Sequence, residues 1–293
     1  MARQKKKATA DRPAIEAFAL FLNQAGLSKR TVSFYLRDID RFFDWLRSRQ
    51  KRAWRWQDVT ELALEEFRAS LTKEDKLSLS TVNRALHALR KFCFWATDKG
   101  LLKEDPAATI VTPRPPEKNA PPPLSVVEVD QLLEAASLSR HGLGKRNYAL
   151  LLLAFETGLR GDELVALSMK DLKLTNRTGT LQVPVLDSHP LALTLRAPMR
   201  RALNRYLATR LDKSNEAPLF TSKRGTRLSH RALQTVIREI ARRAKVKEVT
   251  PHRIRHTFAA RFLAENPDKM WDLADRMGLV SLQPLYRHLS TEE

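Results

Sequence analysis

Two arginines, a histidine and a tyrosine could together act on a phosphodiester. Arg160 lies in a T-G-L-R segment, His252 and Arg255 share a later H-x-x-R segment, and Tyr286 follows near the end. Guanidinium groups stay charged and match the geometry of phosphate oxygens. An imidazole can exchange a proton near neutral pH, and a tyrosyl oxygen can form a covalent phosphoester. These residue types therefore predict a site that holds a phosphodiester and attacks it.

The order of these segments resembles the tyrosine recombinase (phage integrase-like) family. Its signature has an Arg in T-G-L-R, a later H-x-x-R and a C-terminal Tyr. Three intervening segments also follow the family pattern: Pro218-Leu219-Phe220, Arg227-Leu228-Ser229 and Val249-Thr250-Pro251-His252. The similarity extends from about Asp11 to Ser290.

The resemblance implies a role for each residue. Arg160 and Arg255 would hold the non-bridging phosphate oxygens, and His252 would accept a proton or donate to the phosphate. Tyr286 would attack and leave a 3′-phosphotyrosyl link, which conserves the bond energy for rejoining. The expected activity is site-specific cutting and rejoining of duplex DNA, in integration, excision or resolution of a mobile element or replicon. This chemistry requires no cofactor and no metal.

Two departures from the family pattern concern catalysis. No Lys or Arg lies between Arg177 and Arg196, where the family usually carries a Lys as general acid, and Leu279 replaces the His of a third motif. His189 and His288 are candidate substitutes for the missing groups, although a lone His in a turn is most simply a polar turn residue. An alternative therefore stays open: a catalytically weak or inactive recombinase-like DNA-binding protein that partners an active recombinase. A related monomeric topoisomerase fits the two-domain organisation less well.

The charge of the chain points to a polyanionic partner. There are 52 basic and 33 acidic residues, a formal net charge of +19, which favours double-stranded DNA. The family acts as four protomers on two duplexes, so a homo- or hetero-oligomer is expected on DNA. Cys93 is the only cysteine, which fits a reducing, cytoplasmic setting, and a DNA-binding protein is expected to be nucleoid-associated. No apolar run is long enough to span a bilayer, so no membrane is expected.

Proline marks a boundary between two predicted domains. Residues 106–123 are rich in proline and predict a semi-rigid linker. Residues 1–105 carry 22 basic and 14 acidic residues, and residues 124–293 carry 28 and 18. Both halves are thus basic, as expected if they grip one duplex. The predicted fold is mainly α with a small antiparallel β-sheet: an N-terminal helical core-binding domain and a C-terminal α+β tyrosine-recombinase catalytic domain.

Apolar periodicity predicts four helices in the N-terminal half. One covers residues 14–25, and the others begin near the potential caps Ser28, Thr60 and Ser78 or Ser80. In the family these helices contact the DNA groove. The candidate DNA-binding residues are Lys29, Arg30, Asn83, Arg84, Arg90 and Lys91. The plainer interpretation of each is a solvated helix face.

The C-terminal half predicts a helix capped by Ser125 and a second over residues 147–157 that stops at Gly158. Arg160 then lies close to the start of another helix, where anions are attracted, and Glu163 is the internal partner expected to orient it. Strand character is confined to residues 180–195. The remaining helices are predicted at 197–210, 229–244, 251–265 and 268–277.

Overall fold

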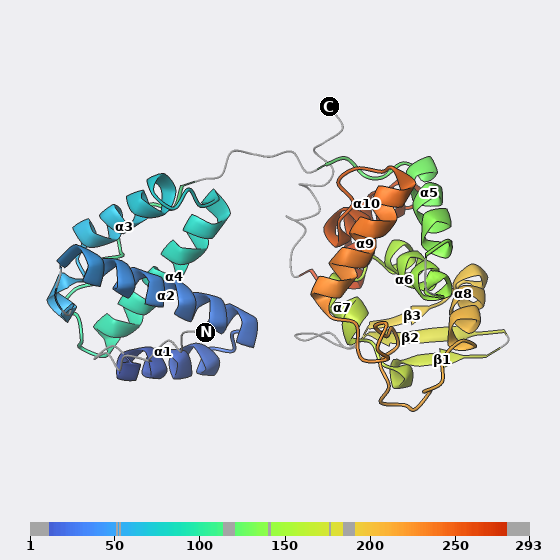
Figure 1. Cartoon of the computed structure of the whole chain (residues 1–293), viewed down its shortest axis with the longest axis horizontal. Coiled ribbons are helices and arrows are strands. Elements are labelled where there is room, and N and C mark those ends of the chain that lie inside the picture. The colour runs from blue at the N-terminus through green and yellow to red at the C-terminus, as the bar shows by residue number, and fades with distance from the viewer. Residues whose placement is uncertain are drawn as a thin grey trace, which may run out of the picture. The chain divides into compact units, whose positions relative to one another are not determined.

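A computed structural model describes residues 12–50, 52, 54–113, 121–139, 142–175, 177–183 and 191–279. The chain divides into two compact units, Met1–Lys118 and Asn119–Glu293. The described residues form helices and one three-stranded antiparallel sheet, and the sheet belongs to the second unit (Figure 1). This confirms the predicted mainly α fold with a small antiparallel sheet.

Four helices build the N-terminal unit: α1 (Arg12–Gln24), α2 (Lys29–Gln50), α3 (Glu61–Lys73) and α4 (Leu79–Asp98), with a short 3-10 turn at Trp56–Asp58. Polar side chains cap three of them. The backbone N–H of Thr31 donates to Ser28 Oγ, Thr60 accepts from Ala63, and Ser78 accepts from Thr81. Of the two proposed starts for the last helix, Ser78 is thus the cap.

Aromatic side chains fill the core of this unit. Phe18 and Phe92 are fully buried and meet edge to face, with ring centroids 5.2 Å apart. Trp54 stacks on Phe43 at 4.2 Å. Such pairs stabilise a core beyond the apolar area they remove from water. The apolar side chains of the four helices, among them Phe18, Phe42 and Leu86, form this core.

The segment after α4 differs from the linker predicted over residues 106–123. Ala107 and Ile110 are each 1% exposed and belong to the N-terminal core. Asn83 Nδ2 donates to the carbonyl oxygen of Pro113 at 2.8 Å. Residues 106–113 therefore pack onto the N-terminal unit, because Ala107 and Ile110 are buried in its core and Pro113 accepts a hydrogen bond from α4.

The C-terminal unit contains α5 (Val126–Ser137), α6 (Gly144–Thr157), α7 (Gly161–Ala166), a 3-10 turn (Met169–Asp171), β1 (Leu172–Leu174), β2 (Gly179–Val183), β3 (Leu191–Thr194), α8 (Ala197–Leu207), α9 (His230–Ala244), α10 (Pro251–Glu265) and α11 (Met270–Arg276). Ser125 caps α5 through a capping box with Glu128, as predicted. The four predicted helices after the sheet are all present.

The sheet has the order β1-β2-β3, with both pairs antiparallel. Leu172 pairs with Leu181, and Leu181 with Leu193. Leu181, Val183 and Leu193 face the main core of this unit. Strand β1 was not predicted. Its three residues, L-K-L, are too short for alternation to be distinguished from a helical or loop pattern.

Helix α10 is anchored deeply in the C-terminal unit. Thr257 is fully buried, and its hydroxyl accepts from the N–H of Leu124 at 2.9 Å. Arg253 Nε donates to the carbonyl oxygen of Pro122 at 2.9 Å. The segment that leads into α5 is thus hydrogen-bonded to the helix that carries His252 and Arg255. No helix of the described residues is long and apolar enough to cross a membrane.

Candidate active site

A tight turn presents Arg160. Helix α6 ends at Thr157, and Gly158 caps it in the left-handed conformation with φ of 64°. A Cβ at Gly158 would lie 2.2 Å from Cδ1 of Phe258. Both the backbone conformation and the lack of space therefore require glycine. The chain then turns, so that Arg160 becomes the N-cap residue of α7 with an exposed side chain.

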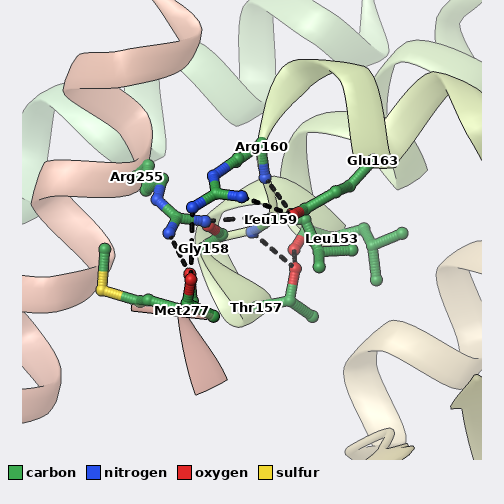
Figure 2. Close-up of polar contacts among 9 residues, drawn as sticks. Leu153, Thr157, Gly158, Leu159, Arg160, Glu163, Arg255 and Met277 are labelled. Carbon is green, nitrogen blue, oxygen red and sulfur yellow. Dashed lines mark hydrogen bonds and ion pairs between the residues drawn. The ribbon is translucent and has the colours of Figure 1, made fainter. Parts of the chain in front are cut away.

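Arg255 reaches the same turn from α10. Its side chain is 9% exposed. Nη1 donates to the carbonyl oxygen of Gly158 at 2.8 Å, and Nη2 to that of Met277 at 2.6 Å. Arg160 Nη2 donates to the carbonyl oxygen of Gly278 at 3.4 Å. Figure 2 shows the two guanidinium groups side by side. Folding thus brings the two predicted phosphate-binding arginines together.

Glu163 faces both arginines. Its Oε2 accepts from the backbone N–H of Arg160 at 2.7 Å, which closes the capping box at the start of α7. Oε1 lies 3.5 Å from Arg160 Nη1, and Oε2 lies 3.9 Å from Arg255 Nη1. The orienting role predicted for Glu163 towards Arg160 is confirmed, and the structure adds Arg255 as its second partner.

The site keeps an excess of positive charge, because two guanidinium groups share one carboxylate. Burial lowers the pKa of Arg255 to about 10; the charge of Arg160 acts in the same direction, and Glu163 opposes both. Arg255 is therefore still charged at neutral pH. A positive group that is mostly withdrawn from water interacts strongly with an anion. The arrangement suits a phosphate whose charge grows during reaction.

His252 lies one helical turn before Arg255 on α10, and part of its side chain is exposed to solvent while part is covered. Partial burial lowers the pKa of His252, and the charges of His256 and Arg255 lower it further. The imidazole is therefore neutral at pH 7 and able to accept a proton. Among the catalytic candidates, Arg160, Arg255 and His252 thus share one region of the C-terminal unit.

The other catalytic candidates, Tyr286, His189 and His288, lie outside the described residues. Leu279, the last described residue, is half-buried and packs against the apolar cluster of α10 and α11 that includes Phe258 and Met277. An apolar side chain in this packing cannot replace an imidazole. Within the described ranges there is no group of three or more His, Cys, Asp or Glu residues placed to hold a metal ion.

Arg227 is a positioning residue whose role the sequence did not reveal. Its Nη1 donates to carbonyl oxygens at the end of α7, including that of Val165 at 2.9 Å, and to that of Leu167, just after the helix, at 2.9 Å. Its Nη2 donates to Ser168 Oγ at 2.8 Å. A guanidinium at a helix C-terminus satisfies carbonyls that the helix leaves unpaired. Arg227 thereby secures the helix that Arg160 begins. Only its place in the R-L-S segment drew attention to it in the sequence.

The six DNA-binding candidates of the N-terminal unit fall into two groups. Lys29, Arg30 and Lys91 are exposed. The other three have intramolecular partners: Asn83 binds the carbonyl oxygen of Pro113, Arg84 binds Asp38, and Arg90 binds the carbonyl oxygen of Ile110. These contacts cross from α4 to α2 or to the segment after α4, which spacing along one helix does not reveal.

Comparison with known proteins identifies the family. Residues 124–288 match the model of the phage integrase family, and residues 15–101 match the phage integrase N-terminal SAM-like domain. A tyrosine recombinase XerC from Roseiflexus sp. (strain RS-1) is 30% identical over 285 residues, covering 94% of this chain and 89% of that protein. The chain belongs to the tyrosine recombinase family. It is an enzyme of the tyrosine recombinase type.

Other tyrosine recombinases agree in sequence and fold. XerD from Oceanobacillus iheyensis is 31% identical over 289 residues, covering 94% of both chains. The crystal structure of the XerH site-specific recombinase in a post-cleavage complex with palindromic difH has a TM-score of 0.71 at 19% identity, covering 97% of this chain and 86% of that one. A lambda integrase dimer on a COC′ core site has a TM-score of 0.72 at 16% identity, covering 96% and 78%. At this identity the structures show a shared tyrosine recombinase fold.

Proposed function

We propose that this recombinase cleaves and rejoins double-stranded DNA at specific sites through a 3′-phosphotyrosyl intermediate on Tyr286. The observation that carries the proposal is the pairing of Arg160 and Arg255 around the Gly158 turn, where the Glu163 carboxylate faces both guanidinium groups. Two planar guanidinium groups with one shared carboxylate leave an excess positive charge, which fits a phosphodiester and its more highly charged transition state.

Each residue has one task in the proposed reaction. The phenolic oxygen of Tyr286 attacks phosphorus and loses its proton, which neutral His252 accepts or passes on. The P–O5′ bond breaks, and the departing 5′ oxygen takes up a proton to leave as a hydroxyl. Arg160 and Arg255 stabilise the charge on the non-bridging oxygens. Attack by a 5′ hydroxyl on the phosphotyrosyl bond reverses these steps and rejoins the strand.

Covalent trapping on a nicked suicide substrate tests this proposal. The released fragment diffuses away, so the protein accumulates on the DNA. The wild type should form a covalent adduct, and Tyr286→Phe should form none while binding the same duplex with nearly unchanged affinity, because one hydroxyl contributes little to a large charged interface. A phosphotyrosyl adduct formed by the Phe variant would show that another residue is the nucleophile.

Oligomerisation and location form part of the same proposal. On DNA, four protomers, identical or shared with a second recombinase, would hold two duplexes, and DNA binding would keep the protein with the nucleoid. The support is the family membership and the positive charge of both halves. Light scattering of the DNA complex measures the number of protomers.

A second candidate function is a catalytically weak DNA-binding protein that partners an active recombinase. The observation that favours it is Leu279, which packs with α10 and α11 where the family usually has a histidine. The trapping experiment separates the two functions. If no adduct forms at a site where binding has been verified, the chain acts as the DNA-binding partner.

A further inference from the structure

Three guanidinium groups of the N-terminal unit surround one aromatic ring. The Cζ atoms of Arg30, Arg37 and Arg84 lie 5.6, 4.9 and 5.0 Å from the centroid of the Phe34 ring. Arg30, Phe34 and Arg37 are spaced four and three residues apart, so they share one face of α2. Arg84 comes from α4. We call these four residues the Phe34 cluster.

Arg84 is the fixed member of the Phe34 cluster. Its Nε donates to Asp38 Oδ2 at 2.8 Å, and its Nη2 donates to Asp38 Oδ1 at 3.0 Å. Asp38 is 1% exposed. The hydrogen bonds between Asp38 and Arg84 raise the pKa of Arg84. A two-point bond to a buried carboxylate defines the plane of the guanidinium, so Arg84 packs against Phe34 as part of the fold rather than as a free surface charge.

Arg30 and Arg37 are the accessible members of the Phe34 cluster. Both are exposed, and no described carboxylate forms an ion pair with either of them. Their guanidinium groups lie against the ring although they carry like charges and have the charge of Arg84 nearby. Attraction to an aromatic ring is weak at an exposed site. An anion bound between them would therefore relieve the repulsion and accept hydrogen bonds from guanidinium groups that pair with no carboxylate of the described residues.

We propose that Arg30 and Arg37, stacked on Phe34, form a two-pronged binding site for a backbone phosphate of duplex DNA, with Phe34 and Arg84 as positioning residues. This inference rests on the proposed function of the chain. A phosphate is favoured over a base, because the ring that could stack on a base already carries guanidinium groups. A nucleic-acid phosphate is favoured over a peptide carboxylate because the chain as a whole carries a charge of +19.

The salt dependence of duplex binding tests the two prongs. Each phosphate contact contributes about 0.9 to the slope of log Kd against log salt. Because both prongs hold one phosphate, the full chain with Arg30→Gln and Arg37→Gln together should lose about 0.9 of the slope, and each single variant should lose part of it; binding should weaken for all duplex sequences alike. The matched control is Arg49→Gln. Arg49 lies on the same helix, and its Cζ atom is 5.4 Å from the centroid of a single ring, that of Trp45. Arg49→Gln should leave the slope unchanged.

Phe34→Leu tests the positioning role, because it removes the ring and keeps an apolar side chain and every charge. Phe34 is only half-buried, so the fold should survive, which circular dichroism checks. Binding should weaken roughly three- to tenfold with the salt slope unchanged, since the prongs lose their support. In the Arg30→Gln/Arg37→Gln background the same change should have no effect. A purely structural role would weaken binding in both backgrounds.

Two results would overturn the inference. Salt slopes for Arg30→Gln and Arg37→Gln equal to the wild type would show that neither residue meets a phosphate. An equal fall for Arg49→Gln would show that only total charge matters. Failure of the proposed function looks different, because the wild type would then form no covalent adduct on the suicide substrate, whatever the salt slopes of the variants.

Discussion

At the scale of single residues, Glu163 has two separable roles. Its carboxylate accepts from the N–H of Arg160 and completes the capping box of α7, and it also faces the guanidinium groups of Arg160 and Arg255. The first role requires only an oxygen acceptor, whereas the second requires a negative charge. Replacement by glutamine keeps the first and removes the second.

We therefore expect Glu163→Gln to reduce cleavage more than stability. Without the carboxylate the two guanidinium groups repel each other, while the cap persists because glutamine also serves in a capping box. Glu163→Ala removes both roles and should cost a further ~1 kcal/mol of unfolding free energy. Denaturant unfolding and covalent trapping of both variants measure these effects. Equal losses of stability would show that the charge, not the cap, stabilises this turn.

The pH dependence of cleavage reports on His252. Its pKa is lowered from the ordinary value of 6.5 by partial burial and by neighbouring positive charge, so the neutral form persists at pH 7 and above. If neutral His252 accepts the tyrosine proton, the rate should fall only as the pH drops below 6.5. His252→Gln should be slow throughout and lack this acidic limb. A rate that instead rises as the pH falls would assign His252 to the opposite role, that of proton donor.

The missing lysine predicts slow departure of the 5′ oxygen. A positioned general acid typically contributes ~10²–10⁴-fold, and no Lys or Arg lies between Arg177 and Arg196. A 5′-bridging phosphorothioate has a leaving group that needs little protonation. We expect it to be cleaved much faster than normal DNA in single-turnover trapping, and the advantage to persist in His189→Ala. If the two substrates react alike in the wild type and diverge in His189→Ala, His189 supplies the proton.

At the scale of elements, the turn between α6 and α7 determines where Arg160 lies. Gly158→Ala combines a left-handed backbone with a Cβ 2.2 Å from the Phe258 ring, and should cost at least about 2 kcal/mol of unfolding free energy. Gly225→Ala is the matched control. Gly225 has φ of 80° with no atom within 4 Å of the added Cβ, so only backbone strain of about 1 kcal/mol remains. Equal losses would mean that Phe258 yields to the methyl group.

The elements also show how far the sequence could predict this protein. The helices followed from apolar spacing and caps such as Ser125 and Thr60, and the end of α6 from Gly158. Strand β1 and the burial of Ile110 could not be predicted, because both depend on contacts with distant segments. The pairing of Arg160 with Arg255 followed from the family resemblance rather than from spacing.

The basic residues of α4 illustrate the same limit. Spacing placed Asn83, Arg84 and Arg90 among the candidate DNA contacts, yet each binds another part of its own unit. A helix position is visible in the sequence, but its partner across the fold is not. Arg84 differs from an exposed arginine only because Asp38, far away in the sequence, is buried beside it.

Because it pairs with buried Asp38, Arg84 should contribute to the free energy of unfolding. Arg84→Ala leaves the 1% exposed Asp38 without its partner, and should cost about 2–3 kcal/mol in chemical unfolding. Asp44→Asn is the control, because Asp44 pairs with Arg47 at the surface with its side chain 71% exposed. Its effect should stay below about 1 kcal/mol. A small effect of Arg84→Ala would mean that Asp38 finds another donor.

At the scale of the whole molecule, the two units have separate apolar cores, and each carries an excess of positive charge. The buried residues of the N-terminal unit and those of the C-terminal unit form different apolar clusters. Residues 1–105 carry 22 basic and 14 acidic residues, and residues 124–293 carry 28 and 18. Each unit should therefore bind duplex DNA weakly, and their covalent connection should decide the affinity of the whole.

A protease site introduced within residues 114–120 tests this connection with a single protein. Before cleavage, binding of one unit raises the local concentration of the other at the duplex. The intact chain should therefore bind roughly 10²–10⁴-fold more tightly than either separated unit. Its affinity should also fall more steeply with salt, because both units then release counterions together. Gel-shift titrations before and after cleavage measure the difference. An unchanged affinity after cleavage would mean that one unit carries all of the binding and that the two do not grip the duplex together.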